Sequence, residues 1–139
     1  MSNAVNSQPA VNVTHLSPIG WQKTRSYSPV VVSQGGSIVW LAGQTTVVDL
    51  QDNDISGKFE EQTRTIFALM NRSLERVGAT LANLVTMTVF INDPRNGDRF
   101  VEIRSEFFEK DRYPASALLT ISNFSRPGSV IEIQGIAVI

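Results

Sequence analysis

The C-terminal stretch of the chain reads YPASALLTISNFSRPGSVIEIQGIAVI (Tyr113–Ile139). Its pattern predicts two strands, Ala115–Ser122 and Val130–Ile139, joined by a short loop that contains a Pro-Gly pair. Because side chains alternate between the faces of a strand, one face of the second strand is apolar throughout. The other face carries Glu132 and Gln134 among apolar residues. A buried charge needs a partner or water, so Glu132 is the first candidate functional residue.

Two amphipathic helices are the clearest elements upstream of this stretch. Apolar residues recur at three- and four-residue steps over Lys58–Val77, and a second helix is predicted over about Asp98–Lys110. Strands are predicted at Val30–Ser33, Ile38–Ala42, Thr45–Val48 and Leu84–Asn92, the first two as a hairpin. This order predicts an α+β domain in which about six strands form a mixed sheet and both helices pack on one face.

The uncovered face of the predicted sheet would expose large apolar side chains to water. These are Val30, Ile38, Trp40, Val85 or its neighbours, Leu118 and Ile136. A sheet face of this kind is normally buried between subunits. The sequence therefore predicts a homo-oligomer.

The composition is that of an ordinary globular protein and excludes several kinds of chemistry. The 139 residues carry a formal net charge of −1, which gives no general attraction to nucleic acid or to an anionic membrane. There is no cysteine, so thiolate nucleophiles, disulfides and Cys-ligated zinc are excluded. The one histidine, His15, lies in a polar segment, which argues against a Ser-His-Asp triad or a histidine-built metal site.

The chain is expected to divide into a polar N-terminal arm, residues 1–20, and a single domain, residues 21–139. The sequence contains neither a signal-peptide core nor an apolar run of membrane-spanning length. We therefore expect a cytoplasmic protein that does not bind membranes. No phosphate-binding loop occurs, and we expect no metal and no cofactor.

Eight short motifs occur in an order and spacing that point to a known family. They are Tyr27-Ser28, Leu41–Gln44, Gln62-Thr63, Val77–Ala79, Thr88–Asp93, Phe107-Phe108, Tyr113–Ala115 and Ile131–Ala137. In these motifs the chain resembles the Rid or YjgF family, whose older label is endoribonuclease L-PSP. The resemblance covers roughly Tyr27 to the C-terminus. It implies the chorismate-mutase-like, YjgF-type fold, assembled as a homotrimer whose sheets line a central barrel and whose ligand clefts lie between subunits.

The resemblance also implies a reaction and its catalytic residues. Archetypal members hydrolyse reactive enamines and imines, such as 2-aminoacrylate and its imine, to a 2-keto acid and ammonia. Glu132 matches the glutamate that positions water in these proteins, and Tyr27 matches a tyrosine of the cleft. These two are the expected catalytic residues, and a small molecule is the expected ligand.

The expected ligand-binding positions depart from the family pattern. Ser116 stands where the family has an arginine for the substrate carboxylate, and Ala42 stands where it has a small polar residue before Gly43. We expect these three residues to line the cleft. Arg126, in the loop before the last strand, is a candidate surrogate for the missing arginine.

Simpler interpretations of these residues stay open. Glu132 could be a solvated or paired charge in a central channel, Tyr27 could serve packing alone, and Arg126 could be an ordinary solvated loop residue. Since serine cannot supply the charge and bidentate geometry of arginine, the alternative is a non-catalytic trimeric small-molecule-binding or scaffold protein. RNA cleavage follows only from the older family label, and the sequence has no basic stripe or catalytic histidine to support it.

Overall fold

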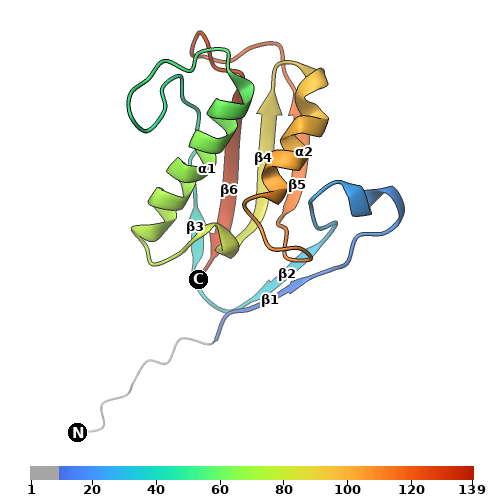
Figure 1. Ribbon diagram of the computed structural model, residues 1–139. Helices are drawn as coiled ribbons and strands as arrows, with labels where there is room; N and C mark the ends of the chain where they lie inside the picture. The colour runs from blue at the N-terminus through green and yellow to red at the C-terminus, as the bar shows by residue number, and fades with distance from the viewer. Residues whose placement is uncertain (1–9) are drawn as a thin grey trace, which may run out of the picture.

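The computed structural model describes residues 10–139, which form two sheets and two α-helices (Figure 1). The part of the predicted arm before residue 10 lies outside the described residues. The elements are β1 (Asn12–His15), β2 (Val31–Gln34), β3 (Ile38–Trp40), α1 (Phe59–Glu75), β4 (Leu84–Ile91), α2 (Gly97–Ser105), β5 (Ala115–Thr120) and β6 (Ile131–Val138). Both helices lie on one face of the larger sheet (Figure 1), so the predicted α+β architecture is confirmed.

The main sheet has the strand order β3-β6-β4-β5. β6 is antiparallel to β3 and β4, whereas β4 and β5 are parallel, so the sheet is mixed as predicted. In its centre, Ile133 of β6 pairs with Val89 of β4, and Ile131 pairs with Ile91. All four side chains are buried against the helices. This register assigns every strand residue to the helix face or to the open face.

α1 packs on the sheet through an apolar stripe, and Gln62 ties it to the segment before the helix and to the loop between β5 and β6. The stripe consists of Phe59, Ile66, Phe67, Met70 and Leu74, all buried. Gln62, which is fully buried, donates from Nε2 to the carbonyls of Ile55 (2.9 Å) and Gly128 (2.8 Å). Gly78 follows the helix with a φ of 78°, a conformation that glycine adopts without strain. Within residues 10–139, neither helix is long and apolar enough to cross a membrane.

Two predictions about the strands are wrong. β2 pairs with β1 instead of β3, so the expected hairpin does not form. Gly35 and Gly36, with positive φ angles of 71° and 75°, lead the chain from the small sheet into the main one. Thr45–Val48 forms no strand, because only the isolated bridges Gln44–Ile133 and Val48–Asp54 occur there. The strands therefore divide between a four-stranded and a two-stranded sheet.

The open face of the main sheet exposes large apolar side chains. Trp40 is 73% exposed, Ile38 57% and Leu119 44%. The prediction that Leu118 belongs to this face is wrong, because it pairs with Val89 and shares its orientation toward the helices. Its neighbour Leu119 takes that place. The predicted apolar face is thus present in the single chain, but without Leu118 and without Val30, which precedes β2 of the two-stranded sheet.

Candidate functional site

Glu132 lies on the open face of β6, directly against Gly43. The segment after β3 runs beside β6, where Gln44 and Ile133 exchange backbone hydrogen bonds of 2.8 and 3.0 Å. This brings Gly43 so close that a Cβ placed on it would lie 3.1 Å from Cδ of Glu132. The absence of a side chain at Gly43 therefore leaves room for the carboxylate. Ala42, the preceding residue, is exposed.

The carboxylate of Glu132 makes no ion pair and no side-chain hydrogen bond with any residue in the range 10–139. The residue is half-buried, and its partner across the sheet is the half-buried Phe90. A carboxylate in an apolar setting needs water or a ligand to satisfy its oxygens.

Ser116 lies on the opposite face of the sheet and contacts an arginine that the sequence analysis did not single out. Its partner in β4 is the buried Met87, so its side chain points toward α2. There, Arg104 donates from its guanidinium to Oγ of Ser116 over 2.6 Å. Arg104 is only 2% exposed.

The remaining contacts of Arg104 are to neutral groups. Nε donates to Oγ of Ser26 (3.2 Å), and the second terminal nitrogen donates to the backbone carbonyl of Arg25 (2.9 Å). The guanidinium also lies 4.9 Å from the ring centroid of Phe100, at a distance typical of a cation–π contact. Burial, and to a smaller extent the charge of Arg25, lowers the pKa of Arg104 to about 10. The guanidinium is therefore still charged near neutral pH.

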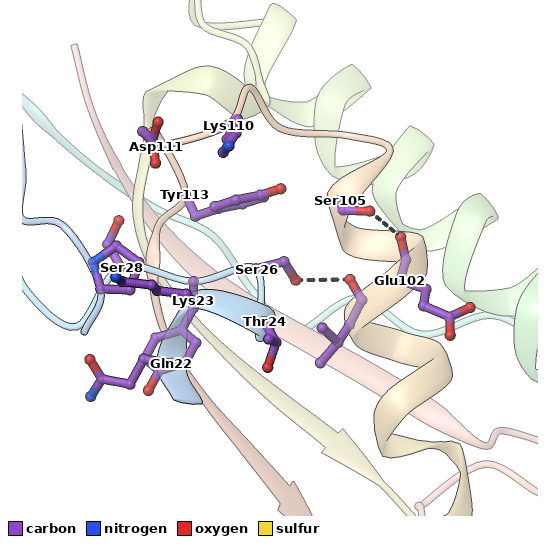
Figure 2. Close-up of a pocket in the computed structure, with 13 residues that line it drawn as sticks. Gln22, Lys23, Thr24, Ser26, Ser28, Glu102, Ser105, Lys110, Asp111 and Tyr113 are labelled. Carbon is purple, nitrogen blue, oxygen red and sulfur yellow. Dashed lines mark hydrogen bonds between the residues drawn. The ribbon is translucent and has the colours of Figure 1, made fainter. Parts of the chain in front are cut away.

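Tyr27 and Ser116 line the same pocket. Its volume is about 280 Å³, and it is bounded by Trp21, Arg25, Tyr27, Val101, Arg104, Ser116 and Leu118. An adjoining pocket of about 310 Å³ shares Tyr27 and Val101 with it. In Figure 2, which draws this second pocket, the hydroxyl of Ser26 donates to the backbone carbonyl of Val101 in α2. Tyr113 also lines this second pocket, and burial raises the pKa of its phenol hydroxyl.

Within one chain, the predicted site residues fall into two groups. Gly43 contacts Glu132 on the open face, whereas Tyr27 and Ser116 line a pocket on the helix side. Arg126 joins neither group. It is exposed in the loop between β5 and β6, where its carbonyl accepts a hydrogen bond from the backbone N–H of Ser129.

The sequence contained a signal for Arg104 that the sequence analysis missed. Phe100, Ile103 and Phe107 recur at three- and four-residue steps and mark the inner side of the second helix. Arg104 lies four residues after Phe100 and three before Phe107, so it shares their side of the helix. An arginine on an apolar stripe is costly to bury without a partner, and this marks it as a residue to explain.

Comparison with known proteins identifies the class to which this fold and these residues belong. A family model described as Endoribonuclease L-PSP matches residues 21–139. The chain belongs to this family, the Rid or YjgF family. The predicted membership is therefore confirmed.

Individual relatives agree with this assignment. The chain is 25% identical to a 2-iminobutanoate/2-iminopropanoate deaminase of Dermatophagoides farinae, over 88% of this chain and 92% of that protein. The Rid-family protein YyfB of Yersinia pestis has the same fold, with a TM-score of 0.79 at 20% identity, over 93% of this chain and 98% of that one. TdcF of Escherichia coli, solved with bound serine, has a TM-score of 0.66 at 25% identity, over 75% of this chain and 82% of that one. The YjgF-type fold is thus confirmed.

Proposed function

We propose that the protein is a homotrimeric hydrolase that converts small reactive enamines or imines to the corresponding carbonyl compound and ammonia, with Glu132 positioning the attacking water. The observation that carries this proposal is the Glu132 carboxylate, which lies on the open sheet face opposite Phe90 and has no cationic partner among residues 10–139. A carboxylate that no cation neutralises can accept a proton from water. Gly43 keeps the space that this requires.

The proposed reaction consumes one water and no other reactant. An enamine first tautomerises to its imine. The water oxygen then bonds to the imine carbon, while Glu132 accepts a proton from the water and passes it to the imine nitrogen. The resulting hydroxyl group gives its proton to the same nitrogen, again through Glu132, as the carbon–nitrogen bond breaks. Ammonia leaves and the carbonyl group remains. Tyr27 is the proposed cleft residue that orients the ligand through its phenol hydroxyl.

Assembly is part of the proposal, because one chain separates the two groups of site residues. The exposed Trp40, Ile38 and Leu119 support burial of the open face between subunits. We propose that the cleft forms at the rim of this interface, where Ala42, Gly43 and Glu132 of one subunit meet the helix-side pocket of the next. Tyr27 and Ser116 would then come from the next. Closure of this face would also remove bulk water from around the reacting atoms.

The names of relatives support a small amino-acid-like ligand. One relative is named a deaminase of 2-iminobutanoate and 2-iminopropanoate, and TdcF was solved with serine. All three compounds are small molecules that carry a carboxylate beside the nitrogen-bearing carbon. A pocket of about 280 Å³ beside Ser116 has room for a compound of this size.

The alternative function is a non-catalytic trimeric binder or scaffold. The observation that favours it is Ser116, which stands where the resemblance implies the carboxylate-binding arginine. Loss of that group would leave the fold and assembly intact while removing the substrate contact. Arg126 is the substitute considered from the sequence, and its exposed position in the loop gives it no contact with the pocket residues.

A coupled deaminase assay tests the proposal. A serine dehydratase generates 2-aminoacrylate, and release of pyruvate is followed with and without the protein. Wild type is compared with Glu132→Gln, which keeps the size of the side chain and removes its basicity. Glu61→Gln is the matched control, because it makes the same change on the exposed surface of α1.

We expect wild type and Glu61→Gln to accelerate release, and Glu132→Gln to lose at least about a hundredfold of that acceleration, the usual contribution of a general base. Full activity of Glu132→Gln would overturn the proposed role of Glu132. Absence of acceleration by the wild type, with the protein folded and trimeric, would favour the binder.

A further inference from the structure

We propose that Ser116 and Arg104 form a carboxylate-binding pair, in which the Ser116 hydroxyl donates to the ligand carboxylate and Arg104 orients and polarises that hydroxyl from α2. This inference rests on the proposed function, because the carboxylate is that of the proposed imino acid. The pair would allow the site to bind a carboxylate although residue 116 is not an arginine.

The hydrogen bond between the two residues fixes the direction of the serine proton. The guanidinium can only donate, so Ser116 Oγ accepts in the 2.6 Å contact. A hydroxyl group has one proton of its own, and no residue in the range 10–139 accepts it. Ser116 lines the pocket and is half-buried. Its proton is therefore available to a ligand, and the charge behind it strengthens the bond that it can make.

The charge of Arg104 also lacks a counterion in the described part of the chain. Charged side chains that are this deeply buried are normally paired with an opposite charge. Here the hydrogen-bond partners are two serine hydroxyls, a backbone carbonyl and the Met87 thioether sulfur, all of them neutral. A bound carboxylate would supply the missing negative charge, one hydroxyl group away from the guanidinium.

The neighbouring cation does not take this role. Arg25 lines the same pocket, but its guanidinium forms an ion pair with Asp98 at 2.7 Å. Tyr27 and Trp21 supply aromatic walls to the pocket. The pocket thus combines one uncompensated buried charge with walls suited to a small organic acid.

The experiment compares binding of pyruvate and pyruvamide, which differ in the carboxylate, by NMR titration of the full chain. The variants are Ser116→Ala, which removes the hydroxyl, and Ser116→Thr, which keeps it. Arg104→Lys keeps a charge and changes the donor geometry. Ser122→Ala, on an exposed residue after β5, is the matched control. The Nε–H signal of Arg104 serves as a direct reporter.

We expect the wild type and Ser122→Ala to bind pyruvate at least about tenfold more tightly than pyruvamide, the value of a hydrogen bond to a charged group. Ser116→Ala should lose that preference, and Ser116→Thr should restore it. Arg104→Lys should weaken pyruvate binding more than pyruvamide binding. Pyruvate, but not pyruvamide, should shift the Arg104 Nε–H signal. A purely structural arginine would change the two affinities equally.

The outcomes separate this inference from the proposed function. If Glu132→Gln abolishes turnover while Ser116→Ala keeps the pyruvate preference, the carboxylate-binding pair is wrong and the hydrolase stands. The opposite result is that the wild type shows no turnover but prefers pyruvate to pyruvamide, and that Ser116→Ala removes this preference. In that case the proposed hydrolase is wrong and the carboxylate-binding pair stands. Equal affinity of the wild type for both probes would overturn the pair.

Discussion

The guanidinium of Arg104 on α2 donates a 2.6 Å hydrogen bond to the hydroxyl of Ser116 on β5. The two residues meet because Ser116 pairs with Met87 and therefore faces the helices. A positive charge is thus present beside residue 116, although the chain has no arginine at that position. It comes from the helix that packs on the strand.

Replacing Ser116 with arginine should destabilise the protein. The new side chain would start within reach of Arg104, and two guanidinium groups would share a site with no carboxylate between them. We expect the free energy of unfolding to fall by about 1–3 kcal/mol, as for other uncompensated buried charges. Urea unfolding of the variant and the wild type measures this difference.

A double-mutant cycle identifies the cause. In an Arg104→Leu background, the same Ser116→Arg change should cost at least about 1 kcal/mol less, because the repulsion is gone. Equal costs in both backgrounds would mean that crowding, and not charge, is responsible.

Much of the fold could be predicted because its elements follow local periodicity. α1 was expected over Lys58–Val77 and spans Phe59–Glu75, and β6 follows the predicted alternation. The pairing of β2 was wrong, because a two-glycine turn is compatible both with a hairpin and with a change of sheet. Sequence pattern alone does not reveal that β1, from the polar N-terminal segment, provides the partner.

The site was less predictable, because its contacts connect distant parts of the chain. Glu132 stood out as a charge on an apolar strand, and the structure adds its contact with Gly43. Arg104 was overlooked, although it lies on the inner side of α2, because its significance depends on Ser116 and Ser26. Only the register of β5 beside β4 brings Ser116 under that helix.

Gly43→Ala should reduce turnover without unfolding the protein. The added methyl group would lie 3.1 Å from Cδ of Glu132, which forces the carboxylate to move by a few tenths of an ångström. Displacement of a catalytic group on this scale should lower kcat by about tenfold or more. The coupled deaminase assay and thermal unfolding are measured together.

The control for this change is Gly97→Ala, at the start of α2. There the nearest atom to the new Cβ would be 3.7 Å away, an ordinary contact, and alanine favours helix. This variant should keep wild-type turnover. Unchanged turnover in Gly43→Ala would show that the contact with Glu132 is not needed for activity.

Gln62→Ala should be strongly destabilising. The side chain is fully buried and bonds to the carbonyls of Ile55 and Gly128 and, through its oxygen, to the backbone N–H of Val130 (3.0 Å). Alanine would leave a cavity and an unsatisfied N–H at the start of β6. We expect a loss of about 2–4 kcal/mol in urea unfolding.

The exposed Gln51 provides the comparison for Gln62. Gln51→Ala should change the free energy of unfolding by less than about 0.5 kcal/mol. Gln62→Glu should also be destabilising, because a carboxylate oxygen would face the two carbonyls that now accept from Nε2. A stable Gln62→Glu protein would mean that the loop between β5 and β6 is anchored mainly by contacts other than those of Gln62.

Trp40→Glu should dissociate the proposed trimer. Trp40 is 73% exposed in the single chain and pairs with Ile136 of the neighbouring strand β6 on the open face. A charge placed in an apolar interface would have to be buried without a partner, at a cost of several kcal/mol for each subunit. Light scattering after size exclusion should then give the mass of a monomer, with an unchanged circular dichroism spectrum.

Val77→Glu makes a comparable change on an exposed apolar residue after α1, on the helix side of the molecule, and should leave the assembly intact. If Trp40→Glu kept the wild-type mass, the subunits would meet through another surface, and the proposed cleft between Glu132 of one subunit and Ser116 of the next would not form at this interface.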